Sequence, residues 1–156
     1  MSETTIPAAA SPDAHPRRYK LGVALSGGGA RGFAHVGALK ALEEAGLKPD
    51  IIAGVSAGSV AGVMYAAGVP LDEMLSMFTA SKFTDFCKLS ISKGEGVFSL
   101  AKFKKFIEKT TGVDRLENLK IPTYIGVTDL DNGVPAEFHD GPLGERVMAS
   151  CSIPIV

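Results

Sequence analysis

Apolar residues form two short continuous runs near the start of the chain, and each run is followed by small residues and an apolar pattern of helical spacing. The runs are 19–25 (YKLGVAL) and 51–55 (IIAGV). Continuous apolar runs of this length are typical of strands buried in a parallel sheet. The segments that follow them predict helices that end at Gly46 and Gly68. The predicted order is therefore strand, helix, strand, helix.

This order predicts an α/β fold, because parallel neighbouring strands are joined by right-handed helical crossovers. We expect a three-layer α/β/α arrangement with a mainly parallel central sheet and helices on both faces. Amphipathic spacing predicts two further helices, the second with Ser99 as its N-cap and Gly112 beyond its end. Turn residues between two apolar runs predict a hairpin. These later elements are helices over 71–78 and 99–112, a loop over 79–97, strands over 121–130 and 134–140, and a helix over 141–152.

The two ends of the sequence differ in character from its centre. Residues 1–18 contain mainly Ser, Thr, Pro and Ala without periodicity, which predicts a mobile tail. The domain is expected to cover 19–156. Its last four residues, IPIV, are apolar, whereas domains usually end in solvated residues. We therefore expect the sequence to stop inside the domain.

Charge and composition exclude some classes of function. Sixteen Lys and Arg against 17 Asp and Glu give a net charge of −1, so nucleic acid is not an expected partner. No apolar stretch reaches the ~18 residues of a membrane-spanning helix, and no secretory leader precedes Cys87 and Cys151. We expect a cytoplasmic protein with reduced thiols, in contact with membranes only peripherally.

One predicted helix carries a basic face opposite an apolar one. Its lysines face either anionic lipid or solvent, and the second interpretation is the simpler one because an apolar stripe at this spacing is typical of a core-facing helix. The lysines are Lys102, Lys104, Lys105 and Lys109.

The second apolar run ends in the motif Gly54-Val55-Ser56-Ala57-Gly58. This is G-x-S-x-G between a strand and a helix, the context that defines a nucleophile elbow. Ser56 is the predicted nucleophile, and Gly54 and Gly58 allow the close backbone approach of the strained turn. The helix after Ser56 would direct its N–H groups at developing negative charge, which suits acyl transfer.

The first apolar run ends in a glycine-rich loop that is also suited to binding an anion. Closely spaced glycine N–H groups in Gly27–Gly32 predict an oxyanion hole. The same loop satisfies the G-x-G-x-x-G pattern of dinucleotide-binding proteins. That interpretation fails because the required acid is not at the end of the second strand, where Ser56 stands, and Asp50 precedes the strand. No Lys-Ser or Lys-Thr follows the glycines, so a phosphate-binding P-loop is excluded as well.

Together, SGGGARGFAHVGALKALEEAG and GVSAGS resemble the patatin-like phospholipases, including their bacterial members, over 20–68. The resemblance implies a lipid or fatty-ester substrate, hydrolysis by Ser56, and no metal or cofactor. It also implies that the glycine-rich motif forms the oxyanion hole. In this sequence those residues are Gly27, Gly28, Gly29, Arg31 and Gly32. The Arg31 side chain either braces this loop or binds a phosphate head group.

The family uses a Ser-Asp dyad whose aspartate lies in a D-G-G or D-G-A motif, and this sequence has neither. The stretch 147–156 resembles the family's segment shortly before that aspartate, which implies a base beyond Val156. Asp140 precedes a glycine, but Pro142 follows, and we expect a hairpin end there.

Other residues in the sequence could in principle act as the general base for Ser56. A triad of Ser56 with Asp129 or Asp131 and His139 would have the chain order of α/β-hydrolases. Turn chemistry explains the two aspartates without catalysis. His35 would lie one helical turn below the glycine loop, where a packed or hydrogen-bonded histidine is expected.

Three functions remain open at this point. The first is a serine-dependent lipid acyl hydrolase, in which Ser56 attacks an ester carbonyl and water releases the acyl-enzyme. The second is a non-catalytic fragment or lipid-binding module that lacks an activating base. The third is an acyltransferase, which would need a histidine near Ser56, and the folded part contains only His35 and His139.

Overall fold

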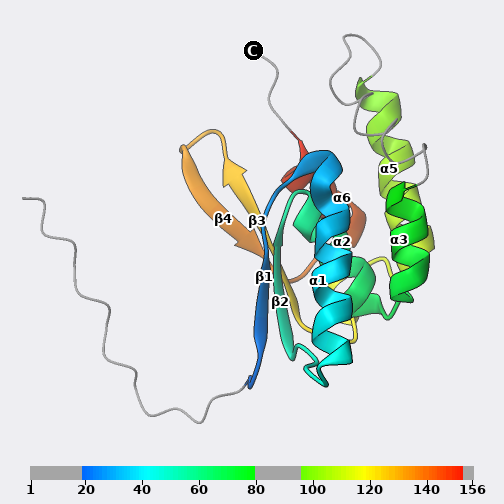
Figure 1. Cartoon of the computed structure of the whole chain (residues 1–156). Coiled ribbons are helices and arrows are strands. Elements are labelled where there is room, and N and C mark those ends of the chain that lie inside the picture. The colour runs from blue at the N-terminus through cyan, green and yellow to red at the C-terminus, as the bar shows by residue number, and fades with distance from the viewer. Residues whose placement is uncertain (1–18, 80–95, 153–156) are drawn as a thin grey trace, which may run out of the picture.

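The computed structural model describes residues 19–79 and 96–152 (Figure 1). The predicted tail over 1–18, Cys87 and the terminal segment 153–156 lie outside the described residues, as does most of the predicted loop over 79–97. The two ends of that loop are helical, because Thr79 ends one helix and Gly96 begins the next. The predicted loop is therefore too long at both ends.

Four strands and several helices follow one another in nearly the predicted order. They are β1 (Gly22–Leu25), η1 (Gly29–Gly32), α1 (Phe33–Glu44), β2 (Ile51–Val55), α2 (Ala57–Ala67), α3 (Leu71–Thr79), α5 (Gly96–Thr111), η2 (Leu116–Asn118), β3 (Thr123–Asp129), β4 (Val134–Phe138) and α6 (Leu143–Cys151). Here η denotes a short 3₁₀ helix. Each predicted strand and helix has a counterpart, and most differ only by a few residues at their ends.

The strands form one sheet in the order β1-β2-β3-β4. β1, β2 and β3 are parallel, and β4 returns antiparallel to β3 as the second strand of a hairpin. In this register Leu25 pairs with Gly54, and Val55 pairs with Gly126. β1 and β2 therefore end side by side at one edge of the sheet, where β3 continues to Asp129. The predicted α/β class and mainly parallel sheet are confirmed.

The described helices cover one face of the sheet (Figure 1). Both crossovers, from β1 to β2 and from β2 to β3, move in the same direction, and right-handed crossovers in one direction place their helices on the same side. α2 lies at the centre of this layer, and all 11 of its residues are buried. On the other face Ala24, Ala53 and Val55 are exposed. The arrangement is consistent with three layers, of which the described residues form the sheet and one helical layer.

The basic helix α5 packs its apolar side against the core. Ile107 is fully buried, and Phe103 and Phe106 are half-buried against the core. Lys104 donates to Glu145 of α6 at 2.7 Å, so part of the basic face is neutralised within the fold. The interpretation as a core-facing stripe is confirmed. The predicted N-cap Ser99 is wrong, because the helix begins three residues earlier at Gly96.

None of the helices in the two described stretches has both the length and the hydropathy needed to cross a bilayer.

Tyr65 of α2 makes a buried polar contact that links two helices. Its ring is 8% exposed, and its hydroxyl donates to Glu43 Oε1 of α1 at 2.9 Å. Burial and the hydrogen bond to this carboxylate raise the pKa of Tyr65 to about 12. The folded state therefore holds the phenol proton more tightly than the unfolded state, whose tyrosine titrates near pH 10.

This contact predicts a pH-dependent effect of Tyr65→Phe. Below pH ~10 the variant should be less stable by about 1 kcal/mol, because it lacks one hydrogen bond. The difference should shrink as the pH rises from 10 to 12, since ionisation of Tyr65 then destabilises the wild type alone. Urea unfolding of both proteins at pH 9 and pH 11.5 measures it. A constant difference across this range would contradict the assignment.

Candidate active site

The predicted nucleophile Ser56 lies at a sharp turn between β2 and α2. Its φ of 52° and ψ of −120° make it the only residue other than glycine with positive φ in the described stretches. A side-chain-bearing residue in such a conformation costs ~1–3 kcal/mol and persists only where its surroundings hold it. A serine held in this way between a strand and a helix is the backbone geometry of a nucleophile elbow.

The two glycines of the motif allow α2 to start against the strands. A Cβ on Gly58 would overlap the carbonyl oxygen of Leu25 at the end of β1, and a Cβ on Gly54 would lie 2.6 Å from the Gly58 oxygen. Both contacts are with backbone atoms, which cannot rotate away. The first turn of α2 therefore lies directly on the ends of β1 and β2. The N–H of Ala57, as the first in this helix, has no partner one turn earlier.

The predicted oxyanion loop lies beside Ser56. A Cβ on Gly27 would be 3.6 Å from the Ser56 Cβ, so the two chain segments lie side by side with room for little more than a methyl group between them. The loop then turns through η1, where Gly29 has a φ of 52°. Within 19–79 and 96–152, the N–H groups of Gly27, Gly28 and Gly29 donate no hydrogen bond. These donors are available to an anion held near Ser56.

The remaining loop residues hold its shape. The Arg31 N–H donates to the Gly28 oxygen at 3.0 Å and closes the short 3₁₀ turn. Gly32 is buried, and a Cβ there would be 2.9 Å from the Ala57 Cβ at the start of α2. The residue Arg31 therefore braces the loop through its backbone, while its side chain is exposed.

His35 is tied to the same loop. Its Nε2 lies 2.8 Å from the Ser26 oxygen, and because a carbonyl only accepts, the ring donates this bond. The expectation of a hydrogen-bonded histidine is confirmed. With Nε2 committed in this way, His35 supports the residue before the glycine loop.

Both backbone groups of Ser56 have partners. Its carbonyl oxygen accepts from the N–H of Ser59, the N–H of Val60 and the Ser59 hydroxyl, the last at 2.7 Å. Its N–H donates to Ser150 Oγ at 2.8 Å. Ser150 is 94 residues away on α6 and was not predicted as a site residue, although it lies in the stretch 147–156 that resembles a family segment.

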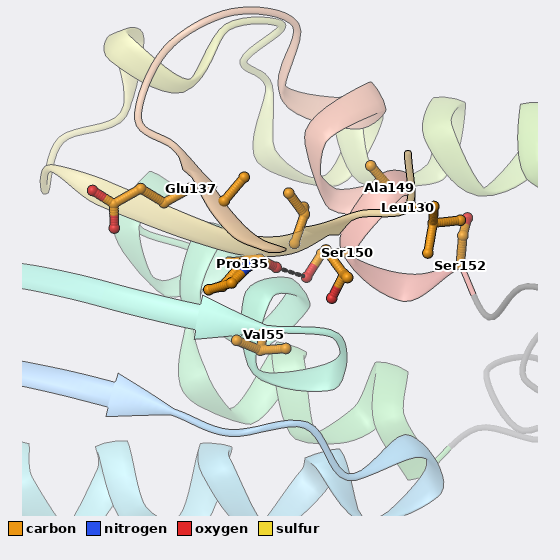
Figure 2. Close-up of a pocket in the computed structure, with 11 residues that line it drawn as sticks. Val55, Leu130, Pro135, Glu137, Ala149, Ser150 and Ser152 are labelled. Carbon is orange, nitrogen blue, oxygen red and sulfur yellow. Dashed lines mark hydrogen bonds between the residues drawn. The ribbon is translucent and has the colours of Figure 1, made fainter. Parts of the chain in front are cut away.

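An open cavity of about 940 Å³ adjoins the elbow (Figure 2). Val55, which precedes the nucleophile, and Ser150 both line it. Most of its other walls come from the β3–β4 hairpin and the end of α6, and they include Val127, Leu130, Pro135, Ala136 and Ala149. The cavity thus brings an apolar surface next to the turn that carries Ser56.

The alternative triad is not brought together. Asp129 accepts from the side-chain amide and N–H of Asn132 and from the N–H of Asp131, and these hydrogen bonds hold its pKa below the usual value. His139 stacks on Tyr124, whose partner in β2 is Ala53. Three strand residues, roughly 10 Å, separate that position from Ser56 along the sheet. Asp129 and His139 lie at opposite ends of the hairpin.

The other two candidate bases, Asp140 and His35, make no hydrogen bond to Ser56. Asp140 lies at the end of the hairpin, as expected, where its carbonyl oxygen accepts from Arg146. In the part of the chain that the structure describes, no carboxylate or imidazole hydrogen-bonds to Ser56 Oγ. The same residues contain no cluster of three His, Cys, Asp or Glu that could bind a metal ion.

Comparison with known proteins agrees with the elbow and the glycine loop. The family model "Patatin-like phospholipase" matches residues 23–156, which include both. The chain belongs to the patatin-like phospholipase family.

Three proteins with similar sequences come from a fungus, a bacterium and human. Lysophospholipase nte1 of Aspergillus fumigatus is 35% identical over 144 residues, which are 85% of this chain and 9% of that protein. An uncharacterized NTE family protein of Mycobacterium tuberculosis is 36% identical over 138 residues, with 86% and 38% covered. Human patatin-like phospholipase domain-containing protein 6 is 32% identical over 143 residues, with 85% and 10% covered. The chain thus spans about a tenth of the fungal and human proteins and 38% of the mycobacterial one.

A solved structure shares the fold. The crystal structure of the type III effector protein ExoU superimposes with a TM-score of 0.62 at 16% identity, over 83% of this chain and 39% of that chain. At this identity the similarity supports the fold alone.

Proposed function

We propose that this chain carries the nucleophile and the oxyanion hole of a serine-dependent lipid acyl hydrolase. Ser56 Oγ attacks the carbonyl carbon of a fatty ester, the alcohol leaves with a proton, and water then releases the fatty acid from the acyl-serine. The N–H groups of Gly28 and Gly29, together with that of Ala57, stabilise the tetrahedral oxyanion. The observation that carries this proposal is the positive φ of Ser56 beside the Gly27–Gly32 loop.

The substrate is proposed to be a phospholipid or lysophospholipid. Membership of the patatin-like phospholipase family and the lysophospholipase among its relatives support a lipid ester. The cavity beside Val55 offers an apolar wall for an acyl chain. We place the acyl chain along this wall and the ester at Ser56.

The base is proposed to be the aspartate of the family's Ser-Asp dyad, which this sequence does not contain in its D-G-G or D-G-A form. Supporting this, Ser56 Oγ has no carboxylate or imidazole partner within 19–79 and 96–152. The same observation favours a second candidate, a lipid-binding module without hydrolytic activity. One measurement distinguishes the hydrolase from the lipid-binding module: the turnover of a chromogenic fatty ester by the purified chain.

The α/β-hydrolase-type triad can be tested with His139→Phe, which removes the titratable ring and keeps the stacking on Tyr124. We expect ester turnover within about twofold of the wild type at every pH from 5 to 9. A loss of a hundredfold or more, the scale of a missing general base, would support the triad instead.

A further inference from the structure

Ser150 occupies a junction between three segments that are distant in sequence. It lies in the last turn of α6, and its Oγ accepts from the Ser56 N–H at 2.8 Å and donates to the Gly126 oxygen of β3 at 2.6 Å (dashed line in Figure 2). The direction of both bonds is fixed, because an amide N–H only donates and a carbonyl only accepts. One hydroxyl therefore joins the elbow, β3 and α6.

The surroundings leave this hydroxyl little freedom. Gly126 is paired with Val55 in the sheet, and a Cβ on Gly126 would lie 2.9 Å from the Val55 Cγ2. The absence of a side chain at Gly126 leaves room for the Val55 side chain at the point where the Ser150 bond forms. Ser150 itself is half-buried at the end of a helix that packs on α5 and β3. The bond is thus anchored on rigid elements at both ends.

Ser56 needs such an anchor at its N–H. Its carbonyl is already held by the first turn of α2, through Ser59 and Val60. Its N–H precedes the helix and, within the described residues, has no backbone acceptor. Holding one side of a residue with positive φ leaves the other free to rotate, and Ser150 Oγ supplies the second fixed point.

We propose that Ser150 is a positioning residue for the nucleophile: its hydroxyl holds the Ser56 N–H and thereby fixes Ser56 beside the Gly27–Gly29 donors. This inference rests on the proposed role of Ser56. It assigns to Ser150 no contact with substrate. Ser59 holds the carbonyl of the same residue from within α2, so the two serines act on the two peptide units that flank the Ser56 Cα.

The test compares Ser150→Ala with Ser150→Thr, which retains a hydroxyl, and with Ser76→Ala, which removes a helical serine hydroxyl from α3. Amide hydrogen exchange measured by NMR reports directly on the Ser56 N–H. We expect exchange at Ser56 to accelerate at least about tenfold in Ser150→Ala, which corresponds to about 1.4 kcal/mol, with Val60 unchanged. Ser150→Thr should retain most of the protection. Unchanged exchange at Ser56 in Ser150→Ala would overturn the inference, whatever the activity of the chain.

The catalytic part of the inference is measured on the fatty ester. Ser150→Ala should lower kcat at least about tenfold with KM nearly unchanged, because the acyl-binding surface is intact and only the direction of attack is altered. Ser150→Thr should recover most of kcat, and Ser76→Ala should equal the wild type. Equal losses in the Ala and Thr variants, in parallel with their melting temperatures, would reduce Ser150 to a structural role. Ser56→Ala, assayed beside them, decides the proposed function separately.

Discussion

Replacing Ser56 by Ala should remove covalent labelling by a fluorophosphonate and abolish the fatty-ester turnover that the wild-type chain shows. The probe reports on the nucleophile alone, since Oγ displaces fluoride from phosphorus and leaves one phosphonyl group on the chain. Without the hydroxyl no acyl-enzyme can form. Intact-mass spectrometry counts the added groups, and a chromogenic fatty ester gives the rate.

Two controls make this result specific. Ser76→Ala removes a serine hydroxyl that donates to the Asp72 oxygen on α3, and it should label and hydrolyse like the wild type. Melting temperatures of all three proteins exclude unfolding as the cause. Equal ester turnover by the wild type and Ser56→Ala would defeat the proposed hydrolase. Vesicle binding by a wild type that neither labels nor turns over substrate would instead favour the lipid-binding module.

The strands and helices around the elbow could be predicted from sequence because the signals there are local. The apolar run before Ser56 matches β2 residue for residue, and α2 ends at Gly68, whose φ is 89°. Glycine in that conformation stops a helix through backbone geometry alone, which a sequence pattern reports directly. The glycine loop could also be predicted, because its signal is a local run of glycines directly after a strand.

Local signals failed where the structure depends on tertiary contacts. Ser99 follows the usual preference for an N-cap, yet α5 begins three residues earlier, at Gly96. The link from Ser150 to Ser56 spans 94 residues. The resemblance of 147–156 to a family segment marks this stretch but does not indicate which of its residues contacts Ser56. That contact follows only from the way α6 packs across the ends of β2 and β3.

The family match covers the residues of the proposed elbow and loop. The base is a separate question, because no carboxylate in 19–79 and 96–152 hydrogen-bonds to Ser56 Oγ. Asp129 is held by Asn132 in the hairpin turn, and Glu145 pairs with Lys104. In the proposed mechanism the oxyanion donors and the nucleophile therefore lie together, and the activating group is a separate contribution.

The close packing of the elbow predicts a large stability difference between two glycine-to-alanine substitutions in helices. Gly58 lies in the first turn of α2 and Gly37 inside α1, and a helical backbone favours alanine over glycine, by about 0.5–1 kcal/mol in a helix interior. They differ in what the new methyl group meets. At Gly37 nothing lies within 4 Å, whereas at Gly58 the methyl overlaps the backbone of Leu25 and Ser26.

Gly37→Ala should therefore raise the free energy of unfolding slightly, while Gly58→Ala should lower it by about 3 kcal/mol, because overpacking against backbone forces the strand and helix apart. The shift separates α2 from the end of β1, so Gly58→Ala should also lose fluorophosphonate labelling in whatever fraction remains folded. Urea titrations that give a lower midpoint at unchanged slope measure the loss as stability rather than as a change in compactness. A Gly58→Ala protein as stable as Gly37→Ala would mean that α2 does not start on the carbonyl of Leu25, and the elbow geometry would then fail with it.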